Sequence, residues 1–234
     1  PSPTDWDRRT RHDFFVLYRP QPGDLIVDVG AGIGTELLSF SAAVGPTGRV
    51  VAIEAHPGTF ARLQRHAELN RLPNVDTHNV AVSSGPGWAE ISGPAGDVAN
   101  RVQRYQANNA VVRTSYRVRA VALDEVVASL PGDIAFLKMN IEGAERQAIE
   151  GMTASITRTQ VACICCHDFL ADDGGPEELR TKECVVEFLS KQGFEVMLPQ
   201  GPLLGPWERD HVHASRRQAP PEPAVVRPSF EAPR

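Results

Sequence analysis

Three glycines alternate with other residues directly after the first strongly apolar run of the chain, Leu25–Val29. They are Gly30, Gly32 and Gly34. Glycines permit a tight turn and let a ligand approach the backbone closely. In the dinucleotide-binding fingerprint the third glycine comes three positions after the second, whereas that position here is Thr35. Because Asp28 also precedes the turn, the pattern favours a ligand with a positive charge over a pyrophosphate.

A second acidic residue, Glu54, ends the next apolar run, Val50–Ile53, and stands 24 residues after Gly30. A carboxylate at such a strand end can accept hydrogen bonds from both hydroxyls of a ribose. Together with the glycine turn, Glu54 predicts a site for a ligand that carries a ribose.

Three further polar residues follow later apolar runs. Asn140 and Glu142 come after Ile134–Met139, and His167 comes after Val161–Cys166. The pKa of a histidine lies near neutrality, so His167 is a candidate general base for a hydroxyl proton. Because ligands of such sheets bind at the carboxyl ends of the strands, we expect these residues to face the glycine turn.

The elements that position these residues alternate between strands and helices. Apolar runs predict strands at residues 25–29, 50–53, 75–82, 134–139, 161–166, 194–198 and 210–215. Helical spacing and capping residues predict helices at residues 6–18, 37–44, 59–70, 123–130, 144–152 and 176–192. Buried strands that alternate with helices are typical of a doubly wound, mostly parallel sheet with helices on both faces. We therefore expect a seven-stranded α/β domain.

A single domain over residues 1–215 suits a chain of 234 residues. Residues 83–117 lack a clear period, which favours a substrate-facing insertion over a packing element. Residues 216–234 hold five prolines and little apolar periodicity. They are expected to form a disordered tail.

Composition narrows the classes of function. The net charge is −5 and 41% of the residues are hydrophobic, so a partner such as a nucleic acid or a membrane surface is not expected. No run approaches the roughly 18 apolar residues of a membrane span, and the first residues lack the apolar stretch of a signal peptide. We expect a soluble, cytoplasmic protein with a small-molecule partner.

The four cysteines are expected to be reduced thiols. Cys163, Cys165 and Cys166 stand directly before His167. Alternate side chains of a strand point to opposite faces, so these four neighbours are not expected to converge on a zinc ion. We interpret the cysteines as small apolar side chains of the core.

Two segments resemble motifs of the class I S-adenosylmethionine-dependent methyltransferases, namely D-V-G-A-G-I-G at 28–34 and V-V-A-I-E-A-H-P at 50–57. The resemblance implies a Rossmann-like fold with S-adenosylmethionine as cofactor. It places the methionine moiety against the glycine turn, the ribose on Glu54 and the adenine beside residues 79–82. The implied cofactor contacts are Asp28, Gly30, Ala31, Gly32, Gly34, Thr35, Glu54, Ala55, Val80, Ala81 and Asn140.

Two further segments resemble the FkbM-type methyltransferases, which methylate hydroxyl oxygens of small molecules such as sugars and polyketide-derived compounds. They are A-L-D-E at 122–125 and F-L-K-M-N-I-E-G-A-E at 136–145, followed by a strand that ends at His167. The resemblance implies an O-methyltransferase of a small hydroxylated acceptor. In this scheme His167 is the base, and Glu142 and Asn140 orient the substrate or join His167 in a Mg²⁺ site.

The chain departs from the FkbM pattern at two positions. Asn140 stands where the family usually has aspartate, and Cys165 where it usually has glutamate. Each change removes a carboxylate, which is the ligand that Mg²⁺ prefers. The departures weaken the expectation of a metal and leave Glu142 as the remaining acid.

Three other interpretations stay open on the sequence. An NAD-dependent oxidoreductase would also use the glycine turn and Glu54, although the glycine spacing disfavours it. A nucleic-acid methyltransferase would share the fold that binds the cofactor, although the acidic composition disfavours this interpretation. A module that binds the cofactor without catalysis would fit the loss of two carboxylates at Asn140 and Cys165.

Overall fold

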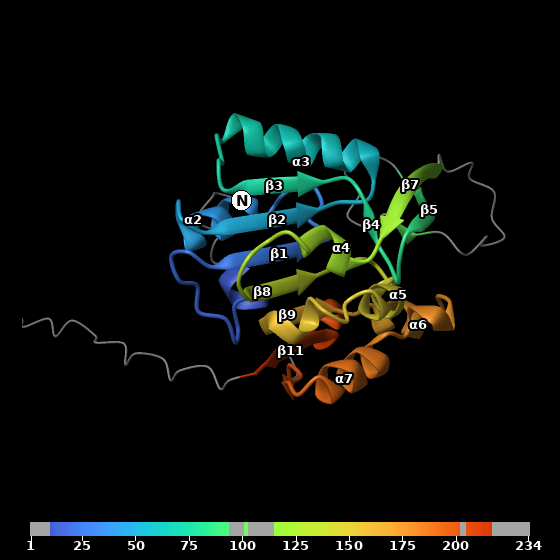
Figure 1. Cartoon of the computed structure of the whole chain (residues 1–234). Coiled ribbons are helices and arrows are strands. Elements are labelled where there is room, and N and C mark those ends of the chain that lie inside the picture. Colours follow the sequence, from blue (N-terminus) through green and yellow to red (C-terminus); the bar gives the residue numbers. More distant parts are fainter. Residues whose placement is uncertain (1–9, 94–100, 103–114, 202–204, 217–234) are drawn as a thin grey trace, which may run out of the picture.

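The computed structural model describes residues 10–93, 101–102, 115–201 and 205–216 (Figure 1). Its centre is a seven-stranded sheet in the order β10-β11-β9-β8-β1-β2-β3. The strands are β1 (Leu25–Val29), β2 (Arg49–Ile53), β3 (Val75–His78), β8 (Ile134–Met139), β9 (Thr159–Cys165), β10 (Glu195–Met197) and β11 (His211–Ser215). Strand β11 runs antiparallel to both of its neighbours, and the other paired strands run parallel. The predicted seven-stranded, mostly parallel sheet is thus confirmed.

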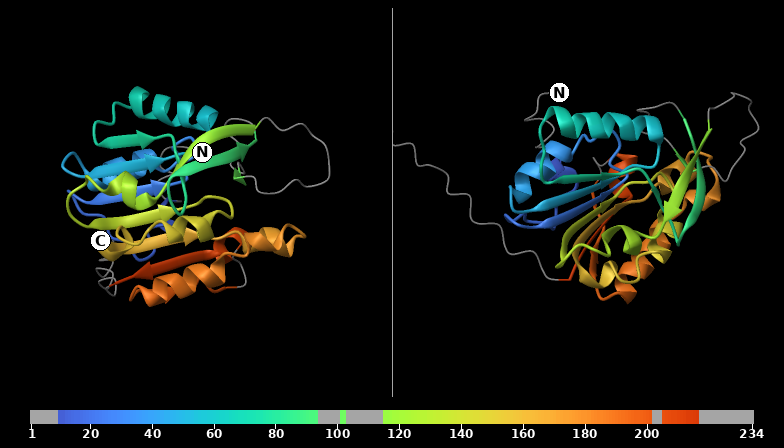
Figure 2. Two further views of the ribbon diagram at one scale, coloured as in Figure 1. Left: turned by 45° about the vertical axis from the view of Figure 1, so that its right-hand side comes forward. Right: turned by 45° about the horizontal axis from the view of Figure 1, so that its top comes forward.

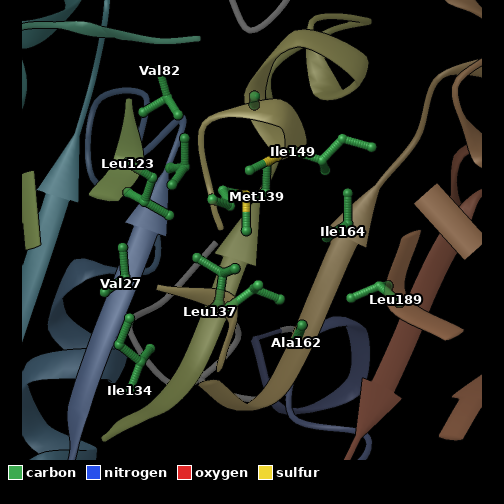
Figure 3. Close-up of a cluster of buried hydrophobic side chains, with 14 of the residues drawn as sticks. Val27, Val82, Leu123, Ile134, Leu137, Met139, Ile149, Ala162, Ile164 and Leu189 are labelled. Atoms are coloured by element: carbon green, nitrogen blue, oxygen red, sulfur yellow. The ribbon is translucent and has the colours of Figure 1, made fainter. Parts of the chain in front are cut away.

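Helices pack on both faces of this sheet, as predicted. One face carries α2 (Leu37–Val44) and α3 (Pro57–Leu69), and the other carries α4 (Leu123–Val127), α5 (Glu145–Glu150) and α7 (Lys182–Lys191). The alternation of side chains along β1 separates the two cores. Ile26 belongs to the core that contains Phe40 of α2, whereas Val27 belongs to the core that contains Leu123 and Leu189 (Figure 3).

A smaller four-stranded sheet lies beyond the carboxyl ends of the parallel strands (Figures 1 and 2). Its strands are β4 (Ala81–Val82), β5 (Gly87–Ser92), β6 (Arg101–Val102) and β7 (Ser115–Val121). The described part of residues 83–117, in which the sequence pattern predicts no strand or helix, thus contains β5, β6 and the start of β7. Tyr116, Val118 and Ala120 alternate with polar residues along β7, which is the pattern of a half-buried strand. Residues 94–100 and 103–114 lie outside the described residues.

The predicted strand over residues 75–82 is divided between the two sheets. β3 ends at His78, and the Asn79 side chain then donates hydrogen bonds to the carbonyl oxygens of Glu54 and Ala55. These bonds turn the chain away from β2, so β4 pairs with β7 instead.

Two predicted helices begin or end elsewhere. The helix predicted from residue 176 is a short 3₁₀ turn, Glu177–Leu179, followed by α7. The Asp168 carboxylate accepts from the backbone N–H groups of Thr181 and Lys182, so a residue distant in sequence fixes the start of α7. Within the described residues the N-terminal helix ends at Asp13, because the next residues enter the core as irregular chain.

The structure adds three short helices that the sequence pattern did not predict. They are α6 (Asp168–Asp172), α8 (Pro206–Arg209) and the 3₁₀ helix Ile156–Arg158. Across the described parts of the chain, no helix has the length and apolar character needed to cross a membrane.

Candidate active site

The glycine turn between β1 and α2 is pressed against the loop that follows β8. A Cβ atom at Gly30 would overlap the carbonyl oxygen of Asn140, and one at Gly34 would come within 2.9 Å of Leu63. Both glycines have positive φ angles, as does Gly32. A Cβ atom at Gly32 would meet no atom within 4 Å. The turn therefore packs closely on two sides and leaves open space beside Gly32.

A buried ion pair between Lys138 and Asp28 contacts the backbone of this turn. Lys138 Nζ lies 2.9 Å from Asp28 Oδ1 and donates to the carbonyl oxygen of Gly30 at 3.0 Å. Burial favours the neutral amine, but the charge of Asp28 outweighs it and raises the pKa of Lys138. Asp28, predicted as a cofactor contact, thus has its carboxylate engaged with Lys138 beneath the turn.

A cavity opens at the carboxyl ends of β1, β2 and β8. It encloses a volume of about 60 Å³. Six of the predicted cofactor contacts line it, namely Gly30, Glu54, Ala55, Val80, Ala81 and Asn140. Ala31, Gly32, Gly34 and Thr35 belong to the adjoining turn.

Glu54 connects the second strand to the glycine turn. Its Oε2 accepts a hydrogen bond from Gly32 N–H at 3.0 Å, and its Oε1 accepts one from His56 N–H at 2.8 Å. Burial raises the pKa of Glu54, while both N–H groups favour the ionised form. Each oxygen retains a lone pair for a further donor, such as a ribose hydroxyl.

Asn140 lines the same cavity and has an unsatisfied acceptor. Its Oδ1 atom is buried and has no hydrogen-bond partner among the described residues. A buried polar atom without a partner costs about 1 to 3 kcal/mol. Such an atom at the cavity wall is suited to accept a hydrogen bond from a ligand.

His167 lies between two carboxylates at the neighbouring strand end. Its Nε2 is 3.2 Å from Glu142 Oε1, and its Nδ1 is 3.3 Å from Glu145 Oε1. Glu145 is fully buried and also accepts a hydrogen bond from the Thr181 hydroxyl. Burial alone would lower the pKa of His167, but hydrogen bonds to the two carboxylates outweigh it and raise the pKa to about 10.

This raised pKa weighs against the role predicted for His167, which is that of a general base. An imidazole with a pKa of about 10 already carries its proton at neutral pH, so it cannot accept another from a hydroxyl group. A protonated ring can donate to Glu142 from Nε2 and to Glu145 from Nδ1. The raised pKa thus favours an imidazolium that orients the two carboxylates.

Glu142 is held in an unusual backbone conformation, with a φ angle of +56°. Non-glycine residues in this left-handed region are uncommon and are often found at functional sites. Glu142 is 17% exposed, whereas Glu145 is fully buried. Of the two carboxylates, Glu142 is therefore the one that a substrate can approach.

The residues named for a Mg²⁺ site do not fit that ion. Glu142 and His167 bind one another, and a protonated imidazole offers no lone pair to a metal. Among the described histidine, cysteine, aspartate and glutamate side chains, the groups that are close enough together to share a metal ion do not include Glu142 or His167. We therefore assign no step of the chemistry to Mg²⁺.

Two residues of this region were missing from the predicted site. Lys138 could have been noticed, since a lysine in the very apolar run Ile134–Met139 must be paired when it is buried. Glu145 begins α5, where an acidic residue is ordinary helix chemistry, so its contact with His167 had no local signal.

Residues 28–196 match the family model described as the methyltransferase FkbM domain. The chain belongs to the FkbM methyltransferase family. It is similar to the 31-O-demethyl-FK506 methyltransferase FkbM of Streptomyces tacrolimicus, with 29% identity over 84% of this chain and 82% of that protein. It is also similar to methyltransferase 1 of Beauveria bassiana (strain ARSEF 2860), with 25% identity over 57% of this chain and 60% of that relative.

A solved structure shares the fold of this FkbM-family methyltransferase. SMU.1697c of Streptococcus mutans, described as a putative methyltransferase in complex with SAH, superposes with a TM-score of 0.51 at 10% identity, over 92% of this chain and 98% of that one. Membership of the family identifies the chain as an S-adenosylmethionine-dependent methyltransferase with a Rossmann-like fold. The oxidoreductase interpretation is thereby set aside.

Proposed function

We propose that this methyltransferase transfers a methyl group from S-adenosylmethionine to a hydroxyl oxygen of a small molecule, a sugar, a glycoside or a polyketide-type compound. The observation that carries the proposal is the loop of residues 140–144. It lines the cofactor cavity through Asn140, Ile141 and Ala144, and it presents Glu142 to His167 at the same sheet edge. The name of the Streptomyces relative, a 31-O-demethyl-FK506 methyltransferase, supports O-methylation.

Three features of the cavity suit S-adenosylmethionine. The open space beside Gly32 can receive the methionine part of the cofactor against the turn. Glu54 retains acceptor capacity for the ribose hydroxyls. The unpartnered Oδ1 of Asn140 can accept from an ammonium group or a hydroxyl group. When bound, the cofactor supplies an electrophilic methyl group on a sulfonium centre.

The protein supplies orientation and a proton acceptor. An alcohol is a weak nucleophile at neutral pH, so removing its proton increases the rate by about 10² to 10⁴. Glu142 Oε1 is bound to His167, so Oε2 is the atom that accepts the hydroxyl proton. The imidazolium of His167 keeps the carboxylate oriented, and buried Glu145 balances the charge of the imidazolium.

The small sheet is proposed to form the acceptor side of the site. Val82 of β4 and Ile91 of β5 line the cavity opposite the loop of residues 140–144. Holding the acceptor hydroxyl in line with the methyl group is worth roughly 7 to 11 kcal/mol of the barrier. We propose that the insertion of residues 83–117 selects the acceptor through this wall.

The proposal is tested by incubating the protein with labelled S-adenosylmethionine and a panel of sugars, glycosides and polyketide alcohols. Matched amine and thiol analogues and acceptors with blocked hydroxyls serve as controls. We expect label in methyl ethers only, located by nuclear magnetic resonance of the product. Transfer only to nitrogen or sulfur would contradict O-methylation. Cofactor binding by calorimetry without any transfer would favour a binding module that lacks catalysis.

A further inference from the structure

Strands β9 and β11 bring two cysteines and two histidines onto one face of the main sheet. In their antiparallel pairing, Cys163 lies opposite His213 and Cys165 lies opposite His211. Directly opposite residues of an antiparallel pair share a face. Both cysteines belong to the core that α2 and α3 cover. The four side chains therefore form a compact group away from the cofactor cavity.

Three members of this group converge on one point. Cys163 Sγ and one ring nitrogen from each of His211 and His213 all lie within 4.8 Å of one another. The three residues are buried, with exposed fractions of 0%, 7% and 2% in that order. Zinc is bound at about 2.0 to 2.3 Å by histidine nitrogen and cysteine sulfur, so ligands around one ion lie within a few ångströms of each other.

Neighbouring side chains enclose the point at which Cys163, His211 and His213 converge. The ring of Phe14 stacks on His211 with a centroid distance of 5.8 Å. Cys165 lies opposite His211 in the strand pairing and belongs to the same core as Cys163.

We propose that Cys163, His211 and His213 form a binding site for a zinc ion. A thiolate and two imidazoles are the ligands that zinc prefers, whereas Mg²⁺ and Ca²⁺ prefer oxygen. The ion connects β9 to β11 beneath the segment that contains Phe14. It takes no part in methyl transfer, because none of its ligands lines the cofactor cavity.

Side chains alternate between the two faces of strand β9. This alternation argues against a zinc site formed by residues 163–167 alone, and it also explains the site proposed here. Cys163 and Cys165 face the core beside α2, whereas Cys166 faces the opposite core. The sequence argument against zinc considered only the consecutive residues 163–167. It overlooked the histidines of β11, which join the group only through strand pairing.

The first test uses the full chain, purified without chelator. We expect elemental analysis to find about one zinc ion per chain. After the zinc is removed, titration with Co²⁺ should saturate at the same ratio and produce the visible absorption of tetrahedral cobalt with a thiolate-to-metal charge-transfer band. Protein without zinc that also fails to develop the thiolate band with Co²⁺ would overturn the proposal.

Variants then assign the ligands. Cys163→Ser and His213→Gln should each weaken Co²⁺ binding by about tenfold or more. Cys166→Ala is the matched control, because this buried cysteine lies beside the same strand but faces the other core. Unchanged Co²⁺ binding by both ligand variants, or an equal loss in the control, would contradict the assignment. The cobalt spectrum of the unmutated protein decides the question even if a variant fails to fold.

Discussion

At the scale of single residues, Glu54 is proposed to accept hydrogen bonds from two sources, the protein backbone and the cofactor. It accepts hydrogen bonds from Gly32 and His56, and it is proposed to receive the ribose hydroxyls. Glu54→Gln keeps one acceptor oxygen but loses the charge. We expect it to weaken S-adenosylmethionine binding by about tenfold or more, since a hydrogen bond to a charged group contributes roughly 1.5 to 3 kcal/mol. Calorimetric titration measures the effect.

The control for this change is Glu68→Gln, at an exposed position on α3. Equal cofactor affinity in the Glu54 variant and the unmutated protein would remove Glu54 from the cofactor site.

His167 links stability to pH. Its pKa is raised to about 10 in the folded chain, against about 6.5 for an unperturbed histidine. The stabilisation is therefore complete below about pH 6.5 and is lost as the pH rises through about 10. We expect His167→Gln to lower the free energy of unfolding more at about pH 6 than at about pH 10. Urea denaturation at both pH values measures this, and equal losses would refute the imidazolium assignment.

Glu142 is the proposed acceptor of the hydroxyl proton. Glu142→Gln retains the size of the side chain and removes its basicity, so turnover should fall by about 10² to 10⁴. Cofactor affinity should stay nearly constant, because Glu142 does not line the cavity. Steady-state kinetics and calorimetry separate the two effects. Glu150→Gln, exposed on the nearby helix α5, should behave as the unmutated enzyme, and full activity in the Glu142 variant would exclude its role.

At the scale of elements, the strands of the central sheet could be predicted because their buried residues form short hydrophobic runs in the sequence. The run Ile134–Met139 is an example, with five of its six residues buried. The division of residues 75–82 could not be predicted, because Ala81 and Val82 are apolar whichever sheet they join. Their assignment depends on pairing with β7, nearly 40 residues later.

In the candidate site, too, some residues could be predicted from the sequence and some contacts could not. Gly30 and Glu54, which line the cavity, could be predicted because each follows an apolar run at the end of a strand. The contacts of Lys138 with Asp28 and of His167 with Glu145 were not predictable, since they join residues 110 and 22 positions apart. The raised pKa of His167 could not be predicted for this reason, because the fold brings the flanking carboxylates to the imidazole.

The start of α7 depends on Asp168, which lies on another helix. Its carboxylate accepts from the N–H groups of Thr181 and Lys182. Loss of a capping side chain costs about 0.5 to 2 kcal/mol, so Asp168→Ala should lower the free energy of unfolding by about 1 kcal/mol. Urea denaturation gives the value. Asp173→Ala, at an exposed position, is the control, and an equal effect of both changes would argue against capping.

At the scale of the whole molecule, Arg216 is the last residue that the structure describes, and it packs against the domain. The sequence places it in the C-terminal tail, but its guanidinium donates to the carbonyl oxygens of Ile156, Thr159 and Gln192. It also stacks over the ring of Phe194 at 4.3 Å. We predict that a chain ending at Arg216 keeps its melting temperature, whereas one ending at Ser215 melts several degrees lower.

The expected difference follows from the lost contacts, since each kcal/mol shifts the melting temperature of a chain of this size by roughly 2 to 4 °C. Calorimetric melting of the two truncated proteins gives the comparison. Equal melting temperatures would show that Arg216 contributes little, and a large loss in the longer chain would show that residues 217–234 contribute to stability.

The burial of Lys138 has a practical consequence for handling the protein. The chain contains only three lysines, and the other two, Lys182 and Lys191, are the first and last residues of α7. Lys138 is 3% exposed and bound to Asp28, so reagents that attack side-chain amines will reach α7 and spare the cofactor turn. Fluorescent dyes or a sensor surface coupled through lysine are therefore expected to attach at α7, where Lys191 is 71% exposed.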